Sequence, residues 1–144
     1  EKCYSFTGTV MGMDSPCNAS TPIVLTVDEV AEIIEQIGSS YLAAYADTQV
    51  LSIRGESLTD WFDRLGEKVR LVRFTDGNYN GYRIWGKGVL PAEKLAEEIY
   101  RTGFNGLISF QIPGERYCEN PKDAQKQNHF RALSAWREVM DCQR

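Results

Sequence analysis

The spacing of apolar and polar residues changes along the chain, and these changes predict alternating strands and helices. Residues 70–74 (Arg-Leu-Val-Arg-Phe) predict a strand that stops at the turn residues 75–77 (Thr-Asp-Gly). A helix is predicted over residues 91–102, and Gly103 closes it. Residues 106–112 (Gly-Leu-Ile-Ser-Phe-Gln-Ile) predict a second buried strand. This order corresponds to two parallel strands joined by a crossover helix.

Three further helices are predicted from apolar residues at helical spacing. Residues 26–29 (Thr-Val-Asp-Glu) match a capping box and open a helix that Gly38 ends. A short helix begins at Ser57 and ends at Gly66, and a terminal helix begins at Pro121. In chain order, the side chains expected to face the core are Val30, Ile33, Ile34 and Ile37; Leu58, Trp61, Phe62 and Leu65; Ala92, Leu95 and Ile99; and Phe130, Leu133, Trp136, Val139 and Met140.

Two more strands complete a regular β-α pattern. Residues 7–13 predict a weak strand that contains two glycines, whereas residues 41–46 predict an apolar one. Four strands that alternate with four helices predict an α/β fold with a parallel sheet and right-handed crossovers. A length of 144 residues corresponds to one domain, so we expect residues 1–144 to form a single unit.

Composition and charge narrow the possible partners. The net charge is −4 and no basic stripe is present, which argues against nucleic-acid binding. No apolar run approaches the roughly 18 residues of a membrane span, and no signal peptide is visible. The cysteines match no metal-binding or redox spacing, which predicts free thiols in a reducing cytoplasm. They are Cys3, Cys17, Cys118 and Cys142.

Four glycine-rich motifs resemble one known family in order and spacing. They are residues 72–77 (Val-Arg-Phe-Thr-Asp-Gly), 81–88 (Gly-Tyr-Arg-Ile-Trp-Gly-Lys-Gly), 103–106 (Gly-Phe-Asn-Gly) and 109–112 (Ser-Phe-Gln-Ile). They are similar to V-H-F-x-D-G, G-H-x-x-W-G-D-G, G-Y-x-G and a strand ending in glutamate, the motifs of the sugar phosphate isomerase/epimerase family. That family consists of xylose isomerase-like TIM barrels.

The resemblance covers only half a barrel, because a complete barrel needs about 200 residues or more. It therefore implies four βα units that correspond to the C-terminal half. A half-barrel has two open strand edges, which favour pairing with another chain. We expect a homodimer or a complementary half-barrel, or a chain that is a piece of a longer protein.

The resemblance also implies a metal site at four successive strand ends. In the family, a glutamate, an aspartate, a histidine and a second glutamate hold manganese, magnesium or zinc. The metal polarises a hydroxy-ketone while the two glutamates transfer the proton. Asp14 falls near the first glutamate and Asp47 matches the aspartate, so these two are the metal candidates. Arg73 stands at the histidine position and Gln111 at the second glutamate, which is the position of a catalytic base.

The replaced residues change the chemistry that this site can perform. Glutamine is not a general base near neutral pH, and the permanently protonated arginine cannot ligate a metal. Arg73 would instead neutralise Asp14 and Asp47. We therefore expect a sugar-like ligand, no bound cofactor and weak or no isomerase activity. The alternative is an active isomerase that a partner half or second copy completes.

Each candidate also has a purely structural interpretation. Asp47 and Asp76 are equally suited to capping the segments that follow them. The structural alternative for Arg73 is a solvated strand residue. Trp85 fits packing as well as stacking on a sugar ring. Lys87, at the family's loop aspartate, suits either an anion or solvent, and His129 is expected at the surface. The candidate ligand-binding residues are Asp14, Asp47, Arg73, Asp76, Tyr82, Trp85, Lys87 and Gln111.

Overall fold

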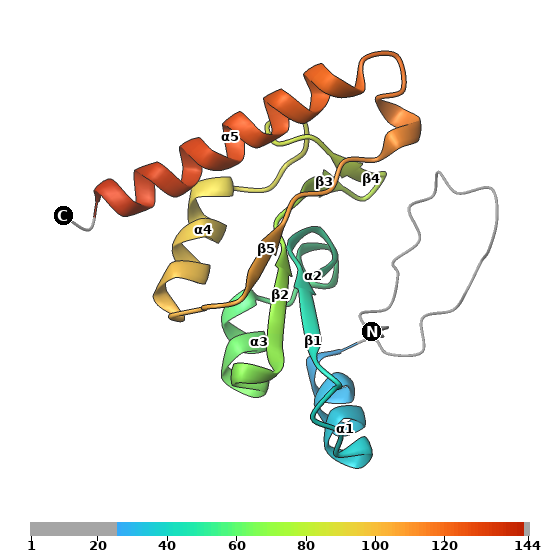
Figure 1. Cartoon of the computed structure of the whole chain (residues 1–144), viewed down its shortest axis with the longest axis vertical. Coiled ribbons are helices and arrows are strands. Elements are labelled where there is room, and N and C mark those ends of the chain that lie inside the picture. The colour runs from blue at the N-terminus through green and yellow to red at the C-terminus, as the bar shows by residue number, and fades with distance from the viewer. Residues whose placement is uncertain (1–25, 143–144) are drawn as a thin grey trace.

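The computed structural model describes residues 26–142, which form a parallel sheet flanked by helices (Figure 1). The predicted α/β class is confirmed, while the predicted strand at residues 7–13 lies outside the described residues. The elements are α1 (Val27–Ile37), β1 (Ala44–Asp47), α2 (Thr48–Arg54), α3 (Leu58–Leu65), η1 (Gly66–Lys68), β2 (Val69–Arg73), β3 (Asp76–Asn78), β4 (Gly81–Arg83), α4 (Ala92–Arg101), β5 (Leu107–Ser109), η2 (Gly114–Arg116) and α5 (Pro121–Asp141).

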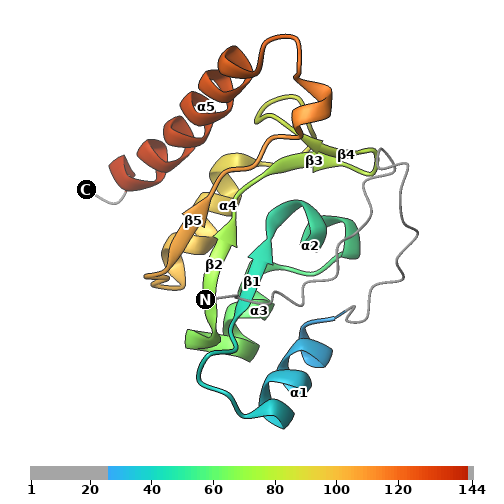
Figure 2. The same ribbon diagram turned by 45° about the vertical axis from the view of Figure 1, so that its right-hand side comes forward.

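The main sheet has the strand order β1-β2-β5, and both of its pairings are parallel. Asp47 pairs with Arg73, and Arg73 pairs with Ser109, so these three residues align at the carboxyl end of the sheet. The short antiparallel hairpin β3–β4 lies beyond that end, as does α2 (Figure 2). The register therefore brings the residues that end successive strands to one edge, as expected for a parallel α/β fold.

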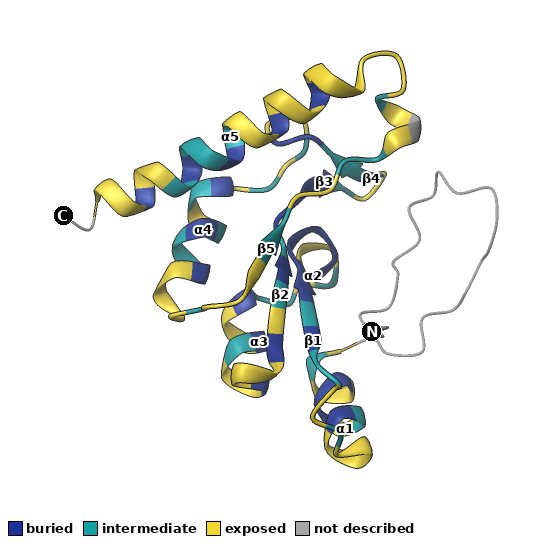
Figure 3. Cartoon of the chain, viewed as in Figure 1, coloured by how far each residue is buried: buried dark blue, intermediate teal, exposed yellow. Residues whose placement is uncertain are grey.

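The two faces of this sheet differ in burial (Figure 3). Ala46 and Val72 are 0% exposed and belong to the core that the helices cover. Tyr45, Leu71 and Leu107 are register partners on the other face, where Leu107 is 70% exposed. Parallel sheets are normally covered on both faces. Residues 26–142 thus form an open sheet and no closed barrel, as half of a barrel would.

The helix starts agree with the sequence analysis. The capping box of α1 is present in both directions, since Thr26 Oγ1 accepts from Glu29 N–H and the Glu29 carboxylate accepts from Thr26 N–H. The first helix ends at Gly38, which has a left-handed φ of 61°. A second capping box joins Ser57 and Asp60 at the start of α3. Local hydrogen-bond patterns therefore fixed these boundaries correctly.

The predictions for four segments need correction. Helix α2 was not predicted, because it follows β1 without a turn and Asp47 caps it directly. Strands β1 and β5 have four and three residues, shorter than the predicted 41–46 and 106–112. The sequence predicts no strand between residues 75 and 90, but this polar segment contains the hairpin β3–β4. Its short strands lack the apolar alternation on which sequence-based prediction depends.

The buried face of α5 differs in part from the predicted one, since Val139 is buried and Trp136 packs against the core as predicted. Phe130 and Met140 are 71% and 54% exposed, and Ile37 of α1 is 54% exposed. The residues of α5 that are buried are Ala124, Asn128, Ala132, Ala135 and Val139. Small side chains let α5 pack closely on α4, which buries Ala92 and Ala96. Within residues 26–142, no helix combines the length and apolar character needed to cross a bilayer.

Candidate functional site

Three polar side chains meet at the carboxyl end of the sheet, and we call them the strand-end cluster (Asp47, Arg73 and Tyr82). Asp47 is 1% exposed, and its Oδ2 accepts from Arg73 Nη1 at 3.4 Å and from the Tyr82 hydroxyl at 2.9 Å. The Arg73 guanidinium also lies 4.9 Å from the centre of the Tyr45 ring, within cation–π range. A buried carboxylate is thus paired with a cation and a hydroxyl donor.

The other oxygen of Asp47 holds the backbone. Oδ1 accepts from the backbone N–H groups of Gln49 at 3.0 Å and Val50 at 3.1 Å, and from the Thr75 hydroxyl at 3.4 Å. Asp47 is therefore the N-cap of α2 as well as the partner of Arg73. The Asp47 carboxylate therefore caps a helix with one oxygen and takes part in the strand-end cluster with the other.

Burial and charge shift the ionisation of the whole cluster. Burial raises the pKa of Asp47, although the Val50 N–H, the Tyr82 hydroxyl and Arg73 act in the opposite direction. Burial and the adjacent Asp47 carboxylate raise the pKa of Tyr82. Burial alone would lower the pKa of Arg73, but Tyr45 and Asp47 reverse this effect and the net shift is upward. Arg73 therefore stays charged and Tyr82 stays a neutral hydroxyl donor near neutral pH.

Asp76 acts as an anchor for the glycine-rich loop. It is 1% exposed, and its two oxygens accept from four backbone N–H groups. Oδ1 binds Gly77 at 2.7 Å and Leu90 at 3.1 Å, and Oδ2 binds Gly86 at 2.9 Å and Gly88 at 2.8 Å. The capping interpretation of Asp76 is confirmed, because the carboxylate closes residues 84–90 over the end of β2.

Trp85 is a packing residue in this structure. It is 4% exposed, its ring centre lies 4.4 Å from that of Phe74, and its indole N–H donates to Phe74 O at 3.2 Å. Its backbone N–H donates to Asn128 Oδ1 at 2.8 Å. Asn128 was missed by the sequence analysis, although its spacing of four residues from Ala124 and Ala132 places it on the buried face of α5.

The remaining predicted site residues are not drawn into the strand-end cluster. Lys87 is exposed in the loop that Asp76 anchors, and His129 is exposed on α5. Gln111 is exposed two residues after β5, and no hydrogen bond or ion pair of its side chain is found in the described part of the chain. Asp14 lies outside the described residues.

The donors that the structure describes do not fit a metal centre. Both oxygens of Asp47 are already used as acceptors, and the charge nearest to Oδ2 is the Arg73 guanidinium. Residues 26–142 contain no group of three or more His, Cys, Asp or Glu side chains that could hold a metal ion. Arg73, permanently protonated, has no lone pair to offer a metal ion.

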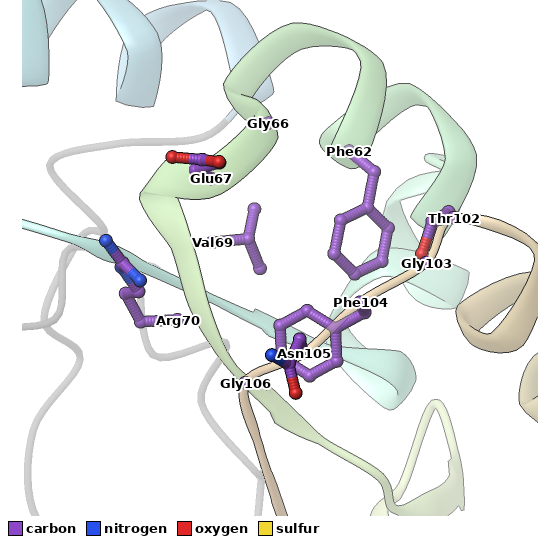
Figure 4. A pocket seen from close by; sticks show the side chains of 10 residues that line it. All are labelled: Phe62, Gly66, Glu67, Val69, Arg70, Thr102, Gly103, Phe104, Asn105 and Gly106. Atoms are coloured by element: carbon purple, nitrogen blue, oxygen red, sulfur yellow. The ribbon is translucent and has the colours of Figure 1, made fainter.

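A cavity of about 440 Å³ lies at the opposite, amino-terminal end of β2 and β5 (Figure 4). The rings of Phe62 and Phe104 form one wall, with centres 5.3 Å apart. Glu67, Arg70 and Asn105 supply the polar groups of its lining. Because parallel strands end in functional groups at their carboxyl ends, the strand-end cluster is the stronger candidate site.

Comparisons with known proteins agree with the fold and the motifs. No family model matches the chain. Two curated relatives, fructoselysine 3-epimerase of Escherichia coli O157:H7 and of Shigella flexneri, are 26% identical over 131 residues, which cover 85% of this chain and 47% of each relative. The chain therefore spans about half the length of the curated relatives it matches.

The fold resembles solved epimerase structures over a similar share. A structure of L-ribulose 3-epimerase matches with a TM-score of 0.62 at 14% identity, covering 84% of this chain and 45% of that one. D-psicose 3-epimerase from Clostridium cellulolyticum H10 matches with a TM-score of 0.55 at 17% identity, covering 83% and 44%. The class is an open β/α sheet that corresponds to the C-terminal part of a TIM-barrel epimerase. The resemblance to the xylose isomerase-like sugar epimerases is confirmed.

The close approach of Asp76 to the glycine-rich loop predicts that Gly88→Ala destabilises the protein. A Cβ at residue 88 would lie 2.1 Å from Asp76 Oδ1 and 2.5 Å from Gly77 N. The hydrogen bonds between Asp76 and the loop would therefore have to break or shift. We expect a loss of about 2–3 kcal/mol in the free energy of unfolding, measured by urea denaturation. Gly114→Ala is the control, because a Cβ there meets no atom within 4 Å. Equal stability of the two variants would contradict a role of Asp76 in holding the loop.

The burial of Asp47 predicts a pH-dependent effect of removing Arg73. Arg73→Met leaves the carboxylate without its cation, and we expect a loss of about 3 kcal/mol near neutral pH. Burial already raises the pKa of Asp47, and losing the guanidinium raises it further. The folded state then binds the Asp47 proton more tightly than the unfolded chain does. The loss should therefore shrink as the pH falls through the raised pKa.

Urea unfolding of Arg73→Met at neutral and acidic pH measures this effect. Arg70→Met is the control, because Arg70 is exposed on the same strand and makes no ion pair among the described residues. Its effect should stay within roughly 0.5 kcal/mol at both pH values. A loss in Arg73→Met that is independent of pH would contradict the pairing with an ionised Asp47.

Proposed function

We propose that the chain is a sugar isomerase/epimerase-like half-barrel that binds a sugar-like ligand at the carboxyl ends of its strands. Its own isomerase activity is weak or absent, because its metal site is degenerate. One observation carries this proposal. The buried Asp47 carboxylate, at the position where the resemblance implies a metal ligand, is already paired with Arg73 and Tyr82.

The chemistry of isomerisation supports the loss of activity. Moving a proton next to a carbonyl needs a base and a group that stabilises the developing oxyanion. Gln111 occupies the family's base position, and its amide does not accept a proton near neutral pH. Arg73 occupies the family's histidine position and has no lone pair to give a manganese, magnesium or zinc ion.

The same residues remain suited to holding a polyhydroxylated molecule. The Arg73 guanidinium has five N–H donors, more than its contact with Asp47 uses, and its side chain is 27% exposed. Sugar hydroxyls can accept from such donors. The half-exposed ring of Tyr45 beside it offers a flat apolar surface of the kind that packs against a sugar ring.

Binding of D-psicose, D-fructose and L-ribulose to the full chain tests the proposal. We expect at least one of these sugars to shift the NMR amide signals of Asp47, Arg73 and Tyr82 in a saturable way. Tyr82→Phe removes the hydroxyl that donates to Asp47 and so loosens the cluster, which should weaken binding about tenfold. Tyr79→Phe, at an 81% exposed ring, should leave it unchanged. Signals that shift only around Phe104 would contradict the assignment.

A two-residue change should restore metal binding. Arg73→His with Gln111→Glu returns the two ligand types that the family resemblance implies together with Asp47 and Asp14. Calorimetric titration with manganese or zinc should then show measurable affinity in the double variant and little in the parent. Equal affinity in the parent would show that Arg73 does not stand in place of the metal.

The alternative is an active metal-dependent isomerase or epimerase that a partner completes. Two observations favour a partner: the face of the sheet around Leu107 is open, and the chain spans about half of its relatives. The occupant we propose is a complementary β/α half, supplied by a second copy of this chain or by the rest of a longer protein. Metal analysis of the purified complex, with loss of thermal stability after chelation, would favour this alternative.

The open sheet face predicts association in solution. Size-exclusion chromatography with light scattering should show a dimer at micromolar concentration, because pairing would bury Tyr45, Leu71 and Leu107. Leu107→Lys should shift the protein toward the monomer, since a charge at the contact is costly to bury. Ile53→Lys, at an exposed position of α2, is the control. A monomer that unfolds cooperatively at this concentration would contradict the prediction.

We also propose a reducing, cytoplasmic location. Cys118 and Cys142 are exposed and free, which supports a compartment in which thiols stay reduced. A thiol titration of the freshly isolated protein under non-reducing conditions addresses this point.

A further inference from the structure

A second cavity, of about 530 Å³, lies between the segment that follows β5 and the first half of α5. In Figure 1 the chain leaves β5, turns through η2 and returns along α5. Phe110 and Ile112 line the cavity from the first segment, and Lys122, Lys126 and His129 line it from the helix. We call these five residues the basic groove. It contains none of the strand-end cluster.

The groove is built on fixed parts of the fold. Lys122, Lys126 and His129 are spaced by four and three residues, so they share one face of α5. The neighbouring Asn128 is 3% exposed and accepts a hydrogen bond from the Trp85 backbone N–H, which ties α5 to the glycine-rich loop. The Phe110 ring packs edge-on against His129, with ring centres 5.9 Å apart, so the apolar wall is in place before any ligand arrives.

The charge of the groove is opposite to that of the whole chain. No acidic side chain lines it, whereas Lys122 and Lys126 both do. Neither lysine forms an ion pair among the described residues, although the chain carries a net charge of −4. Two ammonium groups beside an apolar wall match an anionic group attached to an apolar body.

We propose that the basic groove binds a small organic anion, a phosphate or carboxylate joined to a flat apolar body. The anionic group lies between Lys122 and Lys126, and the apolar body lies against Phe110 and Ile112. A volume of about 530 Å³ is in the range of small-molecule sites. This site does not depend on sugar binding at the strand-end cluster, because the two share no residue.

Titration of the full chain with phenyl phosphate, followed by NMR, tests the proposal. We expect saturable shifts at Phe110, Ile112, Lys126 and His129. Benzoate distinguishes a carboxylate from a phosphate. Inorganic phosphate and benzyl alcohol each supply one half of the ligand and should bind more weakly. Higher ionic strength should weaken the binding of phenyl phosphate.

Matched variants make the test specific. Lys126→Gln should weaken phenyl phosphate binding about tenfold, as expected for losing one charge-assisted hydrogen bond. Lys68→Gln, at an exposed lysine of η1, should leave it unchanged. An equal loss in both variants, or shifts spread over all lysines, would overturn the proposal. Tighter binding of an acidic peptide than of phenyl phosphate would make the groove a peptide site and also overturn it.

Discussion

The buried carboxylate of Asp47 is the constraint on which the carboxyl end of the sheet depends. An ionised group that is 1% exposed needs nearly all its lone pairs satisfied. The protein meets this need with the first turn of α2, the Thr75 hydroxyl, Tyr82 and Arg73. One side chain thereby determines how β1 turns into a helix, where β2 ends and how β4 lies against them.

The loop after β2 also depends on a buried aspartate, but its hydrogen-bond partners are backbone N–H groups. Asp76 is as deeply buried as Asp47, but it is surrounded by backbone N–H groups and forms no ion pair among the described residues. These four bonds make it a structural anchor, whereas Asp47 shares its charge with a half-exposed guanidinium. The two buried aspartates thus differ in use, since Asp76 holds a loop and Asp47 caps α2 and pairs with Arg73.

Much of the fold could be predicted because its signals are local. The capping box at Thr26, the helix start at Ser57 and the glycine at residue 38 specify helix ends within a few residues, and each was predicted correctly. Helix α2 gave no such signal, because its cap is also the last residue of a strand. The face of α5 was misjudged because large apolar residues were chosen, whereas contact with α4 requires alanines.

The strand-end cluster was harder to predict, because its contacts join residues that are far apart in the sequence. Motif spacing pointed to Asp47, Arg73 and Tyr82, and the structure brings these three together. It could not reveal that both oxygens of Asp47 are already occupied, since Thr75 and the backbone of α2 lie there only after folding. Nor could it place Gln111, whose distance from the cluster depends on where β5 stops.

The hydrogen bond between Trp85 and Asn128 has a consequence for the order of synthesis. The glycine-rich loop leaves the ribosome some forty residues before the helix that completes its contacts, because the two residues are 43 positions apart. Until α5 docks, the loop is held by Asp76 and by the contacts of Trp85 with Phe74, and the Trp85 backbone N–H lacks its partner. A nascent or C-terminally shortened chain therefore contains every residue of the strand-end cluster without the final support beneath the loop. The loop beside the cluster then gains the Asn128 hydrogen bond only after α5 has been made.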